Sequence, residues 1–270
     1  MKLPLKILLL ITLVFLFIPH VIAQESFDFN RAYLDYDFTY GAYRKAYEDY
    51  KLARNEYLAF KTLASRERAV FATRMMLEAQ DDAIKAYLTA LRLRLVESVG
   101  VPEFEKNTLF GRIDPEVEWY KNHKPTLASV ITLEGLVDQN LKVKDRFNKV
   151  TIGVIYKTLY FISEGKLVDS IRQTEELTAT IKNKVSQIEA KGDKDTTVIK
   201  RWIGEGEVRI GKSQQKIDEA RNIVERYELR RPLDKGTYQV ALTRLDESHK
   251  LVREAVSFLK EIIREIRTAD

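Results

Sequence analysis

The sequence predicts an all-α fold, in the form of an elongated bundle of five or six long, mostly antiparallel helices with coiled-coil-like seams. Two observations lead to this prediction. Only six prolines and 11 glycines occur in 270 residues, and they fall in clusters that leave long uninterrupted stretches between them. Within those stretches apolar residues recur every three or four positions, which is the spacing of one helix face. Short connections between such helices favour antiparallel neighbours.

The N-terminus, residues 1–23, has the three parts of a secretory signal peptide. Two lysines precede an uncharged run at residues 7–18, and Ala23 ends a cleavage sequence, so we expect the mature chain to begin at Gln24. The alternative is an uncleaved membrane anchor through residues 7–22. A spanning helix needs about 20 apolar residues, and this run is shorter. We therefore expect an exported protein, whether extracellular, periplasmic or held at the cell surface.

Composition and charge narrow the range of partners. The chain has no cysteine, which excludes disulfides, thiolate metal sites and a lipid attached to an N-terminal cysteine. The formal net charge is +5, but lysine and arginine alternate with aspartate and glutamate and form no basic stripe. Nucleic acid is therefore not an expected partner. A membrane is expected to be one only if the N-terminal segment is not cleaved.

The rest of the chain, residues 24–270, is expected to form a single helical-bundle domain. Its predicted parts are a first helical hairpin at 28–98, an irregular connection at 99–124, central helices at 125–190 and a C-terminal hairpin at 196–267. Whether the two helices of the first hairpin are continuous is left open by the sequence.

The irregular connection is inferred from its helix breakers. Gly100, Pro102 and Gly111 interrupt the helical pattern, and Asp114-Pro115 has the character of an N-cap followed by proline at the first helical position. A helix is expected to restart there, and Pro125 is expected to interrupt or kink it.

The central helices contain one ambiguous stretch, residues 150–156. It is rich in β-branched residues and would suit a strand, but no neighbouring segment offers it a partner strand. We therefore expect the most buried helical turns of the bundle at this place. The last central helix is predicted at 151–190, with a break at residues 163–165 as an open alternative.

The two helices of the C-terminal hairpin are expected to pair closely about a turn at residues 232–236. Small residues alternate with large ones along both seams, as at Gly206 and Ser213 in one helix and Ser248 and Ala255 in the other. Alternation of small and large residues lets facing helices interdigitate at a short distance.

A row of aromatic residues in the first helix alternates in spacing between three and four. Such a row is more typical of a core, where each ring buries a large area and its hydroxyl reaches the edge. The choice of tyrosine over leucine also suits a row that docks another chain or a flat ligand. The aromatic residues of the 99–124 connection are expected to cap the bundle, with partner binding as the alternative. The candidate interaction surface therefore comprises Tyr33, Tyr36, Tyr40, Tyr43, Tyr47, Tyr50, Phe104, Phe110 and Trp119.

One motif match suggests nucleotide binding. Residues 206–213, from Gly206 to Ser213, satisfy the phosphate-binding pattern G-x-x-x-x-G-K-[ST]. That pattern works after a buried strand, but Lys200 and Arg201 interrupt any such strand here. Because Gly206 and Ser213 are also seam positions of one helix, we expect the match to be accidental.

Metal and acid–base chemistry find little support in the sequence. Beyond the signal segment there are two histidines, His123 and His249. Metal sites in helical bundles use Glu-x-x-His pairs from two helices, and the nearest spacing here is a single Asp246-x-x-His249. For this pair we expect a surface histidine beside acidic neighbours, and we predict no catalytic residue, no metal and no cofactor.

Three functions remain as hypotheses. The favoured one is an exported, non-enzymatic structural or protein-interaction protein of the cell envelope or extracellular space, which binds an unknown protein partner or itself. The alternative is a helical ligand-binding or sensory module with a cavity between helices. A nucleotide-binding enzyme that uses residues 206–213 is a minor alternative.

Overall fold

The computed structural model describes residues 28–192, 195–228 and 231–267. The predicted signal peptide, its cleavage site and the alternative anchor lie outside these residues. Among the described helices, none combines the length and the apolar character that crossing a membrane requires.

All regular structure in this part of the chain is helical, which confirms the all-α prediction. In chain order the elements are α2 (Phe29–Phe60), α3 (Leu63–Val96), α4 (Glu103–Thr126), the 3-10 turn η1 (Leu127–Ser129), α5 (Leu133–Arg146), the π-helical segment η2 (Phe147–Thr151), α6 (Ile152–Lys191), α7 (Thr197–Glu228) and α8 (Lys235–Arg267).

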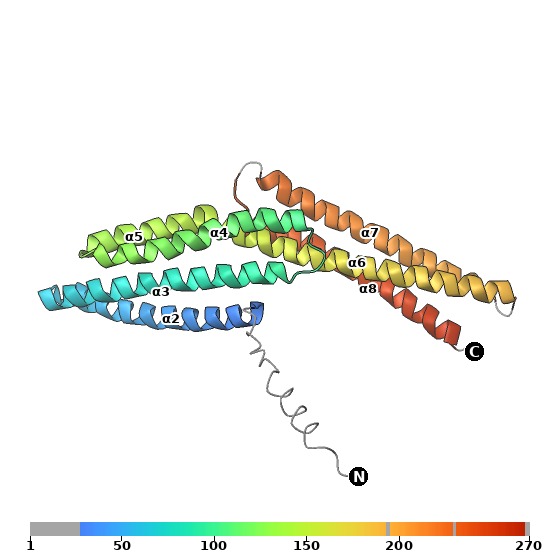
Figure 1. Ribbon diagram of the computed structural model, residues 1–270, viewed down its shortest axis with the longest axis horizontal. Coiled ribbons are helices and arrows are strands. Elements are labelled where there is room, and N and C mark those ends of the chain that lie inside the picture. The colour runs from blue at the N-terminus through green and yellow to red at the C-terminus, as the bar shows by residue number, and fades with distance from the viewer. Residues whose placement is uncertain (1–27, 193–194, 229–230, 268–270) are drawn as a thin grey trace, which may run out of the picture.

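The helices form an elongated arrangement in which α6 runs through the middle and joins two ends (Figure 1). At one end lies the hairpin of α2 and α3, with α4 and α5 beside it. At the other end the second half of α6 packs with α7 and α8. Because α5, η2 and α6 follow one another without a gap, residues 133–191 form one rod. When α5, η2 and α6 are counted as one continuous helix, the described part of the chain has six helices, in agreement with the predicted five or six.

α2 and α3 form an antiparallel hairpin and are not one continuous helix. Lys61 ends α2 with a left-handed backbone, and its N–H donates to the Tyr57 carbonyl at 2.9 Å. Thr62 then caps α3. Its hydroxyl accepts the Ser65 N–H at 3.1 Å, and the Ser65 hydroxyl accepts the Thr62 N–H at 3.1 Å. This reciprocal cap satisfies two backbone donors and fixes where α3 begins.

The predicted irregular connection at 99–124 is wrong, because α4 occupies most of it. Pro115 lies inside α4 and is not its first residue. The proline ring removes the N–H that would bond to the Gly111 carbonyl, but Gly111 is exposed, which leaves that carbonyl open to water. The helix continues through this point because it keeps one buried face, made of Leu109, Ile113, Glu116 and Tyr120.

The predicted start of the last central helix at residue 151 is also wrong. The break falls at residues 130–132, before α5, whereas residues 148–150 lie in η2 and carry the helix onward. The open alternative of a break at 163–165 is not realised, because α6 is continuous there. Gly165 serves packing instead: a Cβ at this position would lie 2.5 Å from Cγ2 of Val101. The connection between α3 and α4 crosses α6 where a larger residue would collide with it.

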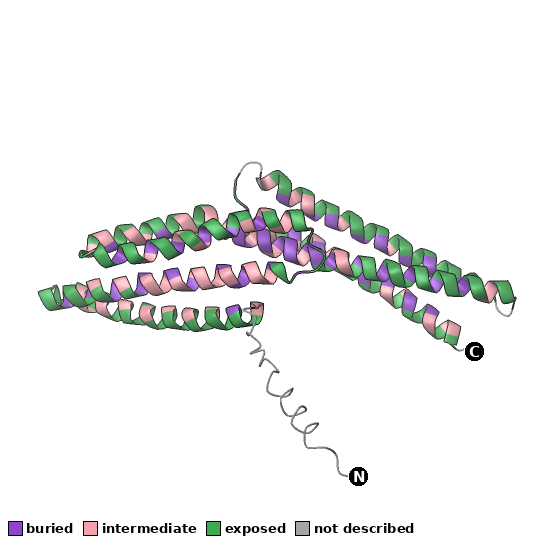
Figure 2. Cartoon of the chain, in the orientation of Figure 1, coloured by how far each residue is buried: buried purple, intermediate pink, exposed green. Residues whose placement is uncertain are grey.

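The core is concentrated along α6 and its neighbours. Figure 2 shows buried residues gathered there, whereas α2 is almost entirely exposed or intermediate. The stretch at 150–156 is helical, as predicted, and Gly153, Val154 and Ile155 in it are buried. The main cluster joins residues of α3, α4, α6, α7 and α8.

The predicted pairing of α7 with α8 is confirmed. The hydroxyls of Ser213 and Ser248 are fully buried and lie 2.7 Å apart, and Ser248 also donates to the Ser213 carbonyl at 2.9 Å. A Cβ built on Gly206 would lie 3.9 Å from the Ala255 carbonyl oxygen. The small residues therefore set the short separation between the two helices.

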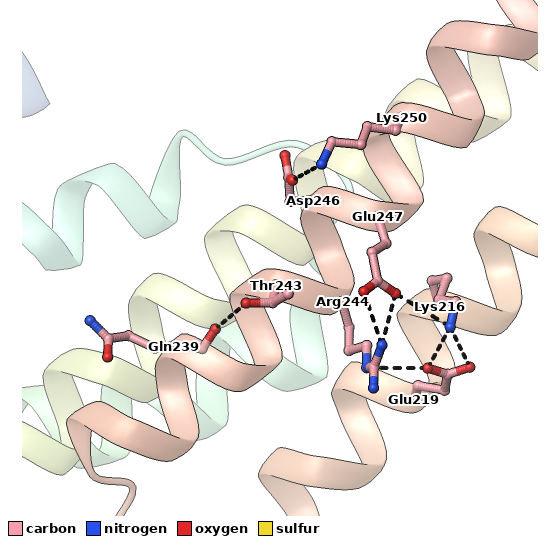
Figure 3. Close-up of polar contacts among 8 residues, drawn as sticks. All are labelled: Lys216, Glu219, Gln239, Thr243, Arg244, Asp246, Glu247 and Lys250. Atoms are coloured by element: carbon pink, nitrogen blue, oxygen red, sulfur yellow. Dashed lines mark hydrogen bonds and ion pairs between the residues drawn. The ribbon is translucent and has the colours of Figure 1, made fainter.

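Charged residues flank this seam. Lys216 and Glu219 of α7 face Arg244 and Glu247 of α8 (Figure 3). Lys216 Nζ lies 3.3 Å from a Glu247 oxygen, and Arg244 Nε lies 3.3 Å from a Glu219 oxygen. Each such exposed pair contributes at most about 1 kcal/mol, so the group chiefly fixes the register of the two helices.

Substitution of Gly206 by leucine tests the α7–α8 seam. Gly206→Leu should lower the free energy of unfolding by about 1–3 kcal/mol, because the larger side chain overpacks the seam against α8. Gly204 provides the control, since nothing lies within 4 Å of a Cβ built there. Gly204→Leu should be neutral or stabilising, because leucine favours helix over glycine. Chemical denaturation measures the free energy of unfolding of both variants. Equal losses of stability would contradict the close packing of α7 on α8 at Gly206.

Candidate protein-interaction site

α2 is held to α3 by a line of small residues. Ala32, Thr39, Ala46 and Ala53 are spaced seven residues apart, and all four are shielded from solvent to some degree. Ala46 packs on a cluster that includes Met76 and Leu77 of α3. Yet Ala32 is the only buried residue among the 32 residues of α2. A helix with so little burial draws little stability from packing, which is where most helical stability in proteins originates.

The tyrosines of α2 form two series, each with a seven-residue repeat. Tyr36, Tyr43 and Tyr50 lie at the edge of the α2–α3 contact and are half-buried. Tyr33, Tyr40 and Tyr47 project further out and are 52%, 42% and 41% exposed. The expectation that this row is buried core is therefore wrong. The reason is that the small residues, and not the tyrosines, occupy the centre of the contact with α3.

The rings of the two series form one continuous row along α2. Consecutive ring centroids are 5.8 to 6.4 Å apart from Phe29 to Tyr50. These separations lie in the range of favourable aromatic pairs. Tyr36 additionally makes an edge-on contact with Tyr87 of α3, with centroids 5.2 Å apart. Each ring thus restrains its neighbours, so the row presents an ordered aromatic surface.

Beside the row lies an open groove of about 430 Å³, which we name the tyrosine groove. One wall comes from α2, the floor from α3, and the other wall from η2 and the first turns of α6. Its lining residues are Tyr36, Tyr40, Tyr43, Gln80, Ala83, Ile84, Tyr87, Phe147, Ile152, Ile155, Tyr156 and Leu159.

The tyrosine groove carries no formal charge. Burial, together with neighbouring phenols, raises the pKa of Tyr36, Tyr43 and Tyr87 above the usual value of 10.0. These hydroxyls are therefore neutral at physiological pH and can both donate and accept hydrogen bonds. The remaining polar side chains of the lining are Tyr40, Tyr156 and Gln80. Such a lining suits apolar and aromatic groups that carry a few hydrogen-bonding atoms.

A buried polar group positions the far wall of the groove. Arg146, which precedes Phe147, donates its Nε–H to Glu116 of α4 at 3.1 Å. Thr151 donates to the same carboxylate at 2.7 Å and lies 2.9 Å from the Tyr120 hydroxyl. Because Glu116, Thr151 and Tyr120 are all buried, loss of any of these partners would leave an unsatisfied polar group. The π-helical segment is therefore anchored to α4 at both of its ends.

The structure separates the nine residues of the predicted interaction surface. The six tyrosines lie together on α2, but Phe104, Phe110 and Trp119 lie along α4. Phe104 is 77% exposed, Phe110 lies under the Arg92 guanidinium at 4.4 Å, and Trp119 stacks on His123. These three residues do not line the tyrosine groove.

Nine of the 12 residues that line the groove were not identified as site residues from the sequence. Ile84 and Tyr87 come from α3, and Ile155, Tyr156 and Leu159 come from α6. The periodicity of each helix indicates that these residues lie on apolar faces, but it does not indicate which faces meet. Tyr156 also stacks on Tyr238 of α8, with centroids 4.9 Å apart, which ties this wall to the C-terminal hairpin.

His123 is a buried histidine. It is 8% exposed, and its Nδ1 lies 2.7 Å from a carboxylate oxygen of Asp81, which is 1% exposed. Its Nε2 lies 3.2 Å from the Gln139 side-chain oxygen. The pair joins α3 to α4 inside the bundle. His249, in contrast, is exposed, as expected.

The phosphate-binding match at residues 206–213 lies wholly within α7. A helix uses its backbone N–H groups in its own hydrogen bonds, so they cannot curl around a phosphate. As predicted, Gly206 and Ser213 are buried seam positions. In the described ranges, no group of three or more His, Asp or Glu side chains is placed to hold a metal ion.

Comparison with known proteins gives no match. No protein-family model, curated protein or solved structure matches this chain.

The contact between His123 and Asp81 predicts that the stability of the fold depends on pH. Burial acts to lower the pKa of His123, but the contact with Asp81 outweighs it and raises the pKa above its usual 6.5. The folded state then binds this proton more tightly than the unfolded state, so the stabilisation is complete below pH 6.5 and is lost as pH rises through the raised pKa. Thermal stability should therefore fall as the pH is raised from about 6 to about 8.

Two variants check the assignment of this pH dependence. His123→Gln should lose most of the slope of melting temperature against pH over this range. His249→Gln, at the exposed histidine, should keep it. An unchanged slope in His123→Gln would show that the dependence arises elsewhere.

Proposed function

We propose that this protein is an exported, non-enzymatic interaction protein that docks a protein partner on the tyrosine face of α2 and the groove beside it. The observation that carries the proposal is the exposed series Tyr33, Tyr40 and Tyr47, set on a helix with a single buried residue. Tyrosine is enriched in the cores of protein interfaces, because its ring buries a large area while the hydroxyl finds a partner.

The length of the aromatic row on α2 supports a protein partner in particular. Its aromatic row runs from Phe29 to Tyr50, well beyond the three tyrosines of α2 that line the groove. A partner that covers the whole row would have to be about 30 Å long, at 1.5 Å per residue over some 20 residues. A helix of another chain meets this requirement, and an aromatic face with heptad spacing is suited to receive one.

The chemistry of the lining favours binding over other activities. The groove offers hydroxyls, one amide and apolar groups, and these side chains supply no cationic contact for a phosphate backbone. Export is part of the proposal and rests on the composition of residues 1–23, with retention through residues 7–22 as its alternative.

Photo-crosslinking in the producing cells tests the proposal. A photoreactive phenylalanine derivative in place of Tyr40, in the full-length chain, should give one discrete adduct, because a partner covers this position. Val208 on α7 is the matched control, since it is an exposed apolar residue at 50% exposure, and the same replacement there should give no such adduct. Equal labelling at both positions, or none at Tyr40, would contradict docking at the tyrosine face.

The same sample tests export. The captured protein should begin at Gln24, because the signal peptide is expected to be removed after Ala23. N-terminal mass spectrometry of the protein recovered outside the cytoplasm measures this. A protein that begins at Met1 and sediments with membranes would favour the anchored alternative.

A helical ligand-binding module is a second candidate, which the size of the groove favours. Its volume of about 430 Å³ lies within the range of small-molecule sites. Soluble oligosaccharides are suitable probes, since sugar rings stack on tyrosine. A rise in melting temperature that is lost in Tyr87→Ala would favour this function over protein docking.

A further inference from the structure

We infer that the docked partner is a second copy of this chain, with its α2 antiparallel to α2 of the first copy across Tyr33, Tyr40 and Tyr47. This inference rests on the proposed function, because it names the occupant of the same tyrosine face.

The exposed tyrosines are arranged symmetrically along the helix. Tyr40 lies seven residues after Tyr33 and seven before Tyr47, and all three are exposed to a similar extent. A two-fold interface requires a surface that is complementary to itself, so that each residue meets its symmetry mate. An axis through Tyr40 would place Tyr40 against Tyr40 of the second copy and Tyr33 against Tyr47. The three outer tyrosines therefore satisfy the two-fold condition without a gap.

Three charges border the row on the side away from the small residues that contact α3, and one of them, Lys51, is paired with Glu48 of the same helix at 2.7 Å. Asp37 and Arg44 are seven residues apart and occupy the same position of the repeat, on either side of Tyr40. Both side chains are exposed, and neither forms an ion pair or hydrogen bond within the part of the chain that the structure describes. They are therefore available to a partner.

The orientation follows from these two charges. In the antiparallel arrangement about Tyr40, Asp37 of each copy faces Arg44 of the other, which forms two attractive pairs. A parallel arrangement in the same register would place Asp37 and Arg44 on the opposite side of the tyrosine row from Asp37 and Arg44 of the second copy, so that neither attractive pair forms. Charges at the rim of an interface contribute mainly to specificity, while the tyrosine rings provide most of the buried area. The surface thus favours one orientation of a second copy.

Reversal of the two charges tests the inference, by sedimentation velocity on protein purified after expression of the full-length chain. Asp37→Arg and Arg44→Asp, each alone, turn both cross-copy pairs into like-charge contacts and should weaken self-association about tenfold or more at low salt. The double variant D37R/R44D restores both pairs with reversed sign and should return to within about threefold of the wild type. Rescue by a double change within one chain is expected only if that chain is its own partner.

Controls separate this effect from net charge and from misfolding. Glu175→Arg on α6 changes the net charge as Asp37→Arg does but lies at an exposed position on another helix, so self-association should be unchanged. Circular dichroism should be the same for all variants, because the substituted residues are exposed. A wild-type protein that stays monomeric at all concentrations, or a double variant without recovery, would overturn the inference.

The failure of the inference can be told from the failure of the proposed function. If Tyr40 crosslinks to a different protein while the purified chain stays monomeric, the tyrosine face docks a partner but that partner is not a second copy. If Tyr40 captures nothing and the chain is monomeric, both proposals are wrong. Capture of this chain by itself, together with the double-variant rescue, supports both.

Discussion

The close contact between α2 and α3 through small residues determines the character of the whole N-terminal half. Alanines and one threonine at seven-residue intervals, Ala32, Thr39, Ala46 and Ala53, occupy the centre of that contact. Small side chains bring the helix axes together, and the bulky residues on either side are then displaced to the edges of the contact. The tyrosines consequently form a wall beside α3 and do not enter a core beneath it. The open tyrosine groove and the small number of buried residues in α2 both follow from this arrangement.

The C-terminal hairpin has a similar spacing of small residues, but its large seam residues are buried. In α7 and α8 small residues such as Ser213 and Ser248 alternate with isoleucine, valine and leucine, and both kinds of seam residue are buried. The apolar seam residues meet their counterparts on the facing helix, so the hairpin closes on itself. In α2 the residues at the centre of the contact are alanine and threonine, while the large residues are tyrosines that lie at its edge or are exposed. Two hairpins with similar periodicity therefore differ because of side-chain size and polarity, one being closed and the other open.

Helix number, helix direction and the pairing of α7 with α8 could be predicted from periodicity and from the distribution of glycine and proline. The errors have physical causes. Pro115 suggested a helix start, but its lost hydrogen bond falls on the exposed carbonyl of Gly111, where water is available. The tyrosines suggested a core, because a repeat of three and four does not reveal which of two adjacent positions faces the neighbour. The burial of His123 was not predicted, because its partner Asp81 lies 42 residues away on another helix. The far wall of the groove likewise depends on which helix faces meet, which a single sequence does not contain.

The central claim is that α2 is incompletely stabilised within one chain and is completed by a partner on its tyrosine face. Hydrogen exchange measured by mass spectrometry on dilute purified protein tests this most directly, because opening free energy varies with local burial. The account predicts that amides of α2, residues Phe29–Phe60, exchange much faster than those of α3, residues Leu63–Val96, and that their protection rises as the partner is added or the protein is concentrated. Protection of α2 equal to that of α3 at the lowest concentration would contradict the account, since α2 would then need no partner.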